Sequence, residues 1–247
     1  MNPADSASCI PTVGRGELAR VKKPGSHRWT TVVISLNSKY VRDAVTAGLT
    51  SLREAGIDPS PALLESIATY IELLLRWNQK LNLTTIRDPR EMVSRNFSES
   101  FLAMRWLQDS GGVLLDIGSG AGFPGLALKL LLPSWKLILI EPNTKKCAFL
   151  SEAARTLGLS EVRVERARWQ DLQCDVSCFT TITCRALGDH AELIRWARER
   201  LAPGGRLILW LGARDADEIS TLGGWNWERV TVPGSRERVI LAGMPQR

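Results

Sequence analysis

Residues 114–125 read Leu114-Leu115-Asp116-Ile117-Gly118-Ser119-Gly120-Ala121-Gly122-Phe123-Pro124-Gly125. The apolar run at the start is typical of a buried β-strand, and the apolar stretch that follows, 126–132, predicts a helix. A glycine-rich turn between a strand and a helix lets a ligand approach the backbone closely. In an open α/β sheet such a turn lies beyond the carboxyl ends of the strands, where ligands bind. The stretch therefore predicts a ligand site in an α/β fold.

Strands and helices alternate from this stretch to the C-terminus. The predicted strands are 113–117, 136–140, 162–165, 179–184 and 206–211, and the helices between them are 126–132, 144–157 and 191–201. Residues 225–232 and 238–242 predict a closing antiparallel hairpin. This order implies a mostly parallel central sheet covered by helices on both faces, which is a Rossmann-like α/β fold.

A helical region precedes the α/β part. Ser60-Pro61 predicts a helix start, because a hydroxyl N-cap is followed by proline at the first helical position. A second helix is expected from Pro89 to about Gln108. We therefore expect a single domain over 44–247, made of a helical cap (44–110) and an α/β core (111–247).

The first 43 residues differ from the rest. They show no sustained apolar periodicity, and they hold seven basic and three acidic residues, so they contribute +4 of the chain's net charge of +6. We expect 1–43 to be a disordered extension with a short ordered piece near 30–36.

Composition favours a cytoplasmic protein. Hydrophobic residues make up 44% and charged residues 23% of the chain, as in ordinary globular proteins. No apolar run approaches the roughly 18 residues of a membrane span, and charges break up the N-terminus, so no membrane partner is expected. The five cysteines are an odd number, and Cys174, Cys178 and Cys184 match no metal-ligand spacing. We expect reduced thiols, no bound metal and a monomer.

The order of glycines indicates which ligand the turn holds. A dinucleotide-binding G-x-G-x-x-G would need glycine at 123, where the chain has Phe123. The pattern from Gly118 is G-x-G-x-G, preceded by Asp116, and it resembles the first motif of class I methyltransferases, which bind S-adenosylmethionine. Glu141 ends the next strand and can accept hydrogen bonds from ribose hydroxyls in either class of ligand, so it does not discriminate.

A more specific resemblance comes from the whole string D-I-G-S-G-A-G-F-P-G, which is similar to that of the RsmG/GidB family. Other family strings occur in the same order: Leu52-Arg53-Glu54-Ala55-Gly56-Ile57, Arg76-Trp77-Asn78-Gln79-Lys80-Leu81-Asn82-Leu83-Thr84, Arg87-Asp88-Pro89, Lys145-Lys146 and Thr183-Cys184-Arg185-Ala186. The resemblance covers about residues 49–247. It implies a class I methyltransferase fold and methylation of N7 of a guanine in 16S ribosomal RNA of the 30S subunit.

The resemblance also implies the site residues. Those expected to bind S-adenosylmethionine are Gly118, Gly120, Phe123, Glu141, Trp169, Gln170 and Arg185. Arg185, at the end of a central strand, is expected at the reactive end of the pocket as the catalytic residue. Its partner there could be guanine O6, a phosphate or the cofactor carboxylate. Trp169 could instead be ordinary core packing.

The chain departs from the family pattern at three positions. The usual R-H-x-x-D-S reads Arg95-Asn96-Phe97-Ser98-Glu99-Ser100, and the lysine of the usual L-K-G is Leu211. Arg214 lies three residues further and could replace that lysine, although arginine and lysine differ as donors. These changes fall on the side expected to meet RNA. Three other functions therefore stay open: methylation of another substrate, a non-catalytic RNA-binding relative, and an NAD-dependent oxidoreductase, which Phe123 disfavours.

Overall fold

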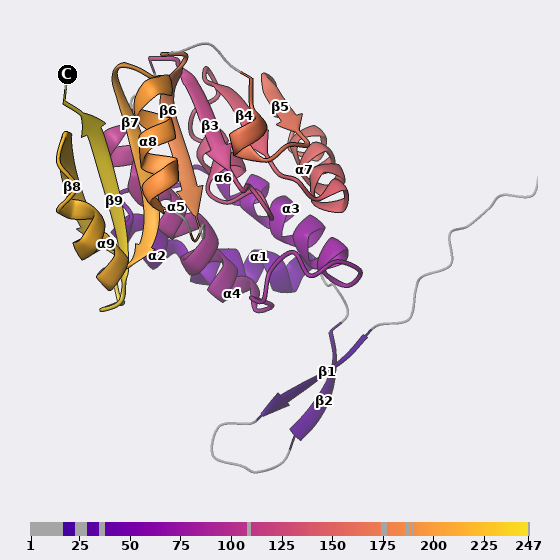
Figure 1. Cartoon of the computed structure of the whole chain (residues 1–247). Coiled ribbons are helices and arrows are strands. Elements are labelled where there is room, and N and C mark those ends of the chain that lie inside the picture. The colour runs from indigo at the N-terminus through magenta and orange to yellow at the C-terminus, as the bar shows by residue number, and fades with distance from the viewer. Residues whose placement is uncertain are drawn as a thin grey trace, which may run out of the picture.

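The computed structural model describes residues 17–22, 29–34, 38–107, 110–173, 177–185, 188 and 190–246. A seven-stranded sheet forms its centre, in the order β5-β4-β3-β6-β7-β9-β8 (Figure 1). Its strands are β3 (Val113–Ile117), β4 (Lys136–Ile140), β5 (Val162–Glu165), β6 (Phe179–Arg185), β7 (Leu201–Gly212), β8 (Trp225–Thr231) and β9 (Arg238–Pro245). The first five pair in parallel, and β9 is antiparallel to both of its neighbours. The predicted mostly parallel sheet with antiparallel C-terminal strands is confirmed.

Helices cover both faces of the sheet (Figure 1). The helical elements are α1 (Ser38–Ala47), α2 (Leu49–Glu54), α3 (Pro61–Asn78), α4 (Pro89–Met92), α5 (Glu99–Phe101), α6 (Gly125–Lys129), α7 (Thr144–Thr156), α8 (His190–Arg200) and α9 (Ala213–Ser220), the π-helical turn η1 (Val93–Ser98), and the 3-10 turns η2 (Leu102–Trp106) and η3 (Trp169–Asp171). One core cluster joins the sheet to α3, α6, α7 and the helical run 89–106. A second cluster joins the opposite face to α8 and α9.

Alternating side chains of single strands supply both clusters. Leu114 of β3 lies in the first cluster and Leu115 in the second. In β7, Ile208 and Trp210 point to the first, and Leu207 and Leu209 to the second. Both faces of these strands are buried, and this is why they read as continuous apolar runs in the sequence.

The helical run 89–106 differs from the single α-helix predicted there. It begins at Pro89, capped by the Asp88 side chain, but six of its residues form the π-helical turn η1. Within it the Glu99 N–H donates to the carbonyl of Ser94, five residues back. A π turn widens a helix by one residue and commonly marks a functional site.

The N-terminal boundary also lies elsewhere than predicted. Helix α1 starts at Ser38, and Val41, Ala44 and Val45 are buried in it, so the folded part begins before residue 44. Residues Glu17–Lys22 (β1) and Trp29–Ile34 (β2) pair as an antiparallel hairpin. The rest of the predicted extension (1–16, 23–28 and 35–37) lies outside the described residues.

Within the described part of the chain, no helix combines the length and apolar character that crossing a membrane requires.

Candidate functional site

The glycine-rich turn connects β3 to α6 at the carboxyl ends of the parallel strands. Gly118 and Gly122 have φ values of 69° and 83°, a left-handed conformation that glycine adopts without strain. A Cβ atom on Gly122 would lie 2.0 Å from the Tyr70 hydroxyl. The turn therefore requires glycine at these positions for its own path.

Most N–H groups of this turn already have acceptors. Those of Gly118 and Ser119 donate to the Ile140 carbonyl at 2.9 and 3.1 Å, and that of Gly120 donates to Glu141 Oε2 at 3.0 Å. A pyrophosphate-binding turn keeps such groups free for its ligand. This arrangement disfavours a dinucleotide and suits a ligand that needs space at the backbone but brings no pyrophosphate.

Glu141 is buried, and both of its carboxylate oxygens contact the backbone. Oε2 accepts from Gly120, and Oε1 accepts from the Asn143 N–H at 2.9 Å. An ionised carboxylate offers about four lone-pair sites, so capacity remains for ligand hydroxyls. Glu141 thus fixes the turn as well as lining a cavity, a second role that the sequence did not indicate.

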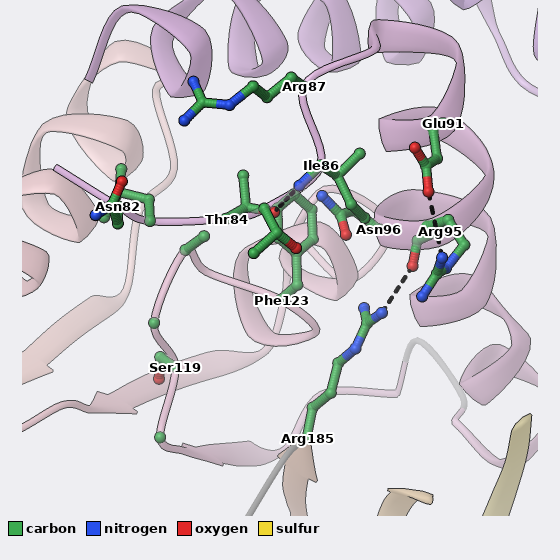
Figure 2. Close-up of a pocket in the computed structure, with 15 residues that line it drawn as sticks. Asn82, Thr84, Ile86, Arg87, Glu91, Arg95, Asn96, Ser119, Phe123 and Arg185 are labelled. Atoms are coloured by element: carbon green, nitrogen blue, oxygen red, sulfur yellow. Dashed lines mark hydrogen bonds and ion pairs between the residues drawn. The ribbon is translucent and has the colours of Figure 1, made fainter. Parts of the chain in front are cut away.

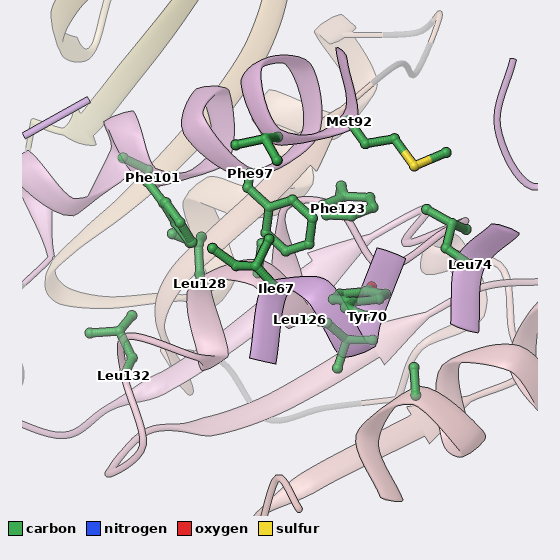
Figure 3. Close-up of a cluster of buried hydrophobic side chains, with 14 of the residues drawn as sticks. Ile67, Tyr70, Leu74, Met92, Phe97, Phe101, Phe123, Leu126, Leu128 and Leu132 are labelled. Carbon is green, nitrogen blue, oxygen red and sulfur yellow. The ribbon is translucent and has the colours of Figure 1, made fainter. Parts of the chain in front are cut away.

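The helical cap supports the turn from behind. The Tyr70 hydroxyl of α3 donates to the Ala121 carbonyl at 2.8 Å, and its ring stacks on Phe123 with centroids 5.1 Å apart. Phe97 packs edge-on against both rings (Figure 3). Phe123 is 8% exposed, so it belongs to the core and also borders the site.

Two cavities share Gly118 in their lining. The larger has a volume of about 720 Å³ and includes 82–87, Glu91, Arg95, Asn96, Ser119, Gly120, Ala121, Phe123 and Arg185 in its lining (Figure 2). The smaller has about 380 Å³ and is lined by Ile140, Glu141, Pro142, Ala167, Arg168, Trp169 and Gln170. Gly118 lines both. An elongated ligand could therefore occupy both by passing Gly118.

All seven residues expected at the site line one of these two cavities. Trp169 and Gln170 lie on η3 beside Glu141. Gln170 is exposed, whereas Trp169 is 5% exposed and packs edge-on against Trp196 at 5.4 Å. Trp169 therefore serves as core packing and as a cavity wall at once.

Arg185 reaches from the end of β6 across the larger cavity to the helical run. Its Nη2 donates to the Arg95 carbonyl at 3.0 Å and lies 3.4 Å from Glu99 Oε2 (Figure 2). Burial lowers the pKa of this guanidinium from its usual value, and nearby Glu99 opposes that shift. Nη1 is buried and has no hydrogen-bond partner among the described residues.

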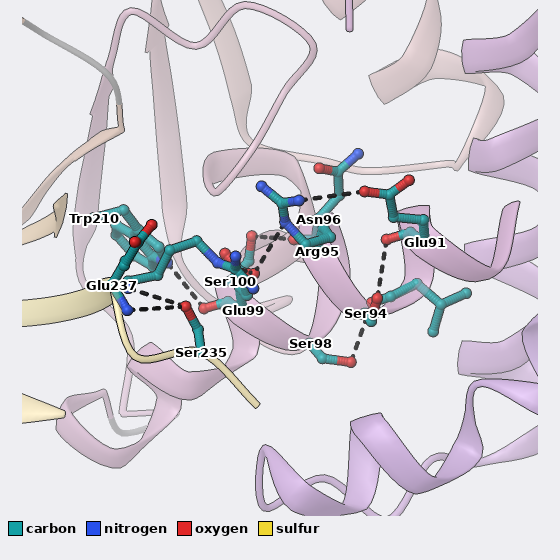
Figure 4. Close-up of polar contacts among 12 residues, drawn as sticks. Glu91, Ser94, Arg95, Asn96, Ser98, Glu99, Ser100, Trp210, Ser235 and Glu237 are labelled. Carbon is teal, nitrogen blue, oxygen red and sulfur yellow. Dashed lines mark hydrogen bonds and ion pairs between the residues drawn. The ribbon is translucent and has the colours of Figure 1, made fainter. Parts of the chain in front are cut away.

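Three arginines converge on the single carboxylate of Glu99. Arg238 Nε donates to Oε1 at 2.9 Å, Arg95 Nε lies 3.4 Å from the same oxygen, and Arg185 approaches Oε2. The Glu99 side chain is 5% exposed, and its backbone carbonyl accepts from Trp210 Nε1 at 2.9 Å (Figure 4). This departure from the family pattern thus sits at the centre of an arginine cluster.

Asp116, below the turn, has an unusual acidity. Its carboxylate accepts from the Thr183 hydroxyl at 2.8 Å and from the Gly125 N–H at 3.3 Å. It is nonetheless wholly buried, and this burial raises its pKa to about 6 against the stabilising effect of those bonds.

Loop 82–87 forms a wall that we did not predict from sequence. The buried Asn78 side chain shapes it, because Nδ2 donates to the Thr84 carbonyl and Oδ1 accepts from the N–H groups of Leu83 and Thr84. The sequence signal that could have predicted this loop is the string from Trp77-Asn78 to Asn82-Leu83-Thr84. A polar string of this kind following an apolar helix indicates a loop with a specific geometry.

Leu211, which stands where the family has lysine, lies near the arginine cluster. Leu211 lines a neighbouring cavity of about 430 Å³ together with Arg95, Arg185 and Arg238. Arg214 is 91% exposed on α9 and pairs with Glu218 at 3.1 Å. Its partner thus lies on the same helix, four residues further on.

Comparison with protein families gives a match over residues 63–225 to the GidB family, described as rRNA small subunit methyltransferase G. The chain is 39% identical to ribosomal RNA small subunit methyltransferase G of Halorhodospira halophila, over 69% of this chain and 80% of that protein. It is 38% identical to the protein of the same name from Stenotrophomonas maltophilia, over 78% and 92%. These matches confirm the resemblance deduced from the sequence.

Solved structures share the fold at low sequence identity. A SAM-dependent methyltransferase from Aquifex aeolicus aligns with a TM-score of 0.55 and 16% identity, over 66% of this chain and 97% of that chain. A ribosomal protein L11 methylase from Lactobacillus delbrueckii subsp. bulgaricus aligns with a TM-score of 0.53 and 14% identity, over 62% and 80%. The class I methyltransferase fold is thereby confirmed.

Proposed function

The chain belongs to the GidB family of ribosomal RNA small subunit methyltransferases, and we propose that it methylates N7 of a guanine in 16S ribosomal RNA, using S-adenosylmethionine. Its partner would be the 30S subunit in the cytoplasm, which it would meet as a monomer. The observation that carries the proposal is the pair of cavities that share Gly118 in their lining. One is suited to the cofactor, and the other opens beside Arg185.

The described residues fit the proposed cofactor. Gly118 leaves space at the junction, Glu141 retains acceptor capacity for ribose hydroxyls, and Trp169 and Gln170 offer an apolar face and an amide for the adenine. When bound, S-adenosylmethionine supplies the methyl group as an electrophilic sulfonium. The partnered N–H groups of the turn argue against NAD, so the oxidoreductase alternative loses its main requirement.

Methylation at N7 requires little acid–base catalysis from the protein. Guanine N7 carries a free lone pair, so no general base is needed, and the chain has only two histidines. The residues around the larger cavity would act by holding the base in line with the methyl group. The methylated base gains a positive charge. Arg185 is therefore better suited to O6, a phosphate or a carboxylate than to N7 itself.

The two residues that replace the family histidine and aspartate are polar and contribute to the site. Asn96 and Glu99, which replace histidine and aspartate, are both buried at the site, and Glu99 pairs with three arginines. Neither change removes a group that methyl transfer to N7 requires. These contacts favour an active enzyme over a non-catalytic RNA-binding relative.

The test is methylation of isolated 30S subunits. Subunits from a strain that lacks this gene are incubated with the purified protein and labelled S-adenosylmethionine, and the product is mapped by mass spectrometry. We expect one methyl group per 16S molecule, on N7 of one guanine. Methylation at another atom or base would contradict the proposal. Binding of both ligands without any methyl transfer would favour the non-catalytic alternative.

A further inference from the structure

Three residues that line the larger cavity carry a buried donor with no hydrogen-bond acceptor within the described part of the chain. One of these donors, Nε of Arg95, lies 3.4 Å from Glu99 Oε1 in an ion pair. The other two are Nδ2 of Asn96, whose residue is 5% exposed, and Nη1 of Arg185. Both residues line the cavity, and Figure 2 shows the Arg185 side chain extending toward Arg95. Buried polar groups are nearly always hydrogen-bonded. Two unpaired donors at one cavity therefore indicate a ligand that supplies acceptors.

Both donors are held in place. Arg185 is anchored through Nη2, which leaves Nη1 directed elsewhere. The acceptor of this anchor lies within the π turn. The Glu99 N–H bonds to Ser94 rather than to Arg95, and the Arg95 carbonyl accepts from Arg185. Asn96 belongs to the same π turn, between the buried Phe97 and the anchored Arg95. The π turn thus contains Asn96 and also the carbonyl group that anchors Arg185.

The chemistry of purines points to the acceptor. Guanine and adenine both carry an N7 lone pair, so attack by N7 alone does not distinguish them. They differ at position 6, where guanine has a carbonyl oxygen with two lone pairs and adenine has an amino group that donates. Two N–H donors that face position 6 would bind the guanine oxygen. The Arg185 guanidinium has no acceptor for the adenine amino group, and the Asn96 amide offers none when Nδ2, rather than Oδ1, faces position 6.

We propose that Asn96 and Arg185 form the subsite that receives O6 of the substrate base, and that Asn96 is the residue by which the enzyme rejects adenine. This inference rests on the proposed N7 methylation of a guanine. A neutral amide suits the task, because it donates at every physiological pH and adds no further positive charge beside a base that becomes cationic. The same donors could serve a carboxylate of the cofactor, and the experiment separates that case.

The test compares the wild type with Asn96→Asp, which keeps the shape and replaces the donor by an acceptor. Two substrates are used: 30S subunits with the target guanine, and subunits in which that base is adenine. For the wild type we expect methylation of adenine subunits to be about 100-fold slower. For Asn96→Asp the rate on guanine should fall about 10- to 100-fold, and the guanine-to-adenine ratio should fall by the same factor. The affinity for S-adenosylmethionine should change less than about 2-fold.

Two further variants serve as controls. Asn226→Asp makes the same chemical change on the exposed strand β8, where Oδ1 accepts from Gln246 and the change keeps that oxygen; it should match the wild type. Asn96→His restores an N–H donor, the residue of the family pattern, and should retain the preference for guanine even if Asn96→Asp proves unstable.

Three results would overturn the inference. These are an unchanged ratio in Asn96→Asp, a parallel loss of cofactor affinity, which would assign Asn96 to the cofactor, and a wild type that accepts adenine. Methylation of guanine at an atom other than N7 would instead refute the proposed function. The mapping of the product therefore keeps the two failures apart.

Discussion

Two groups of residues, the turn wall and the arginine wall, meet at the larger cavity, and their polar groups are paired differently. The turn wall, 116–125 with Glu141, satisfies its main N–H groups and both carboxylates within the protein. The arginine wall, formed by Arg95, Asn96, Glu99 and Arg185, leaves three buried donors without a hydrogen-bond acceptor among the described residues: Arg95 Nε, Asn96 Nδ2 and Arg185 Nη1. A buried unpaired group costs about 1–3 kcal/mol. The polar groups of the turn wall thus find their hydrogen-bond partners on folding, whereas the free donors of the arginine wall need a ligand to supply acceptors. Substitutions on the two walls should therefore have different consequences.

The largest effect is expected on the turn wall, from Gly118→Val. A β-branched side chain is strained at φ 69°, and it would fill the junction of the two cavities. Binding of S-adenosylmethionine measured by calorimetry should become undetectable. Gly158→Val is the matched control, because Gly158 has φ 64° and open space around its Cβ position. The control should lose stability and keep cofactor affinity. Normal affinity in Gly118→Val would refute the assignment of the junction.

Arg185→Ala should give the next largest effect, on the arginine wall. Glu99 would still be paired with Arg95 and Arg238, so the protein should fold. The single-turnover rate on 30S subunits should fall about 100- to 1,000-fold, as when one preorganised donor is removed, with cofactor affinity nearly unchanged. A loss of cofactor affinity of roughly 1.5–3 kcal/mol would instead assign Arg185 to the cofactor carboxylate. Arg185→Lys should recover little, because one ammonium group cannot hold the Arg95 carbonyl and a ligand in the same geometry.

A smaller effect concerns pH and Asp116. Its pKa is about 6 in the folded protein against 3.8 for an ordinary aspartate. As pH rises from about 4, the unfolded chain loses this proton first, so this group lowers stability until the folded protein has also lost its proton above pH 6. Relative to Asp116→Asn, the wild type should lose about 1 kcal/mol of unfolding free energy between pH 5 and pH 7. Denaturant titrations at the two pH values measure this. An equal stability difference at both would show that the pKa of Asp116 is ordinary.

The smallest effect is expected from removal of residues 1–37, the part of the N-terminal extension that precedes α1 and belongs to neither wall. Removal of residues 1–37, with a net charge of +3, should leave the denaturation midpoint unchanged and weaken 30S binding only a few-fold, with a lower salt dependence. Removal of residues 1–43 should cost about 2 kcal/mol of stability, since it deletes the buried Val41 of α1. Equal stability of the two truncated proteins would place the domain boundary at 44 after all.

Sequence was sufficient for the turn wall and its strands. The strands 113–117, 136–140 and 162–165 were predicted with the bounds that the structure has, because buried apolar runs bounded by turn residues leave little choice of position. The short helix α9 was not predicted, because only two of its residues, Ala216 and Ile219, are buried. A helix with so few apolar residues has almost no periodicity to detect.

The arginine wall was harder to predict, for a physical reason. The π turn depends on partners distant in sequence, because Arg185 binds the Arg95 carbonyl and Trp210 binds the Glu99 carbonyl. Local propensity predicts an α-helix there. Residue identities indicated that Asn96 and Glu99 were unusual, but only the folded arrangement revealed that Asn96 lacks an acceptor and that Glu99 gathers three arginines.

The ion pair between Glu99 and Arg238 joins residues 139 positions apart, whereas the bond from Tyr70 to Ala121 spans only 51. A chain is synthesised from its N-terminus, so Tyr70 and the turn that it supports leave the ribosome well before β9. Arg238 comes from that last strand, and until it arrives Glu99 lacks one of its three partners. The order of translation thus delays completion of the Glu99 ion pairs until β9 has been synthesised, so a chain that stops before β9 would lack one of them.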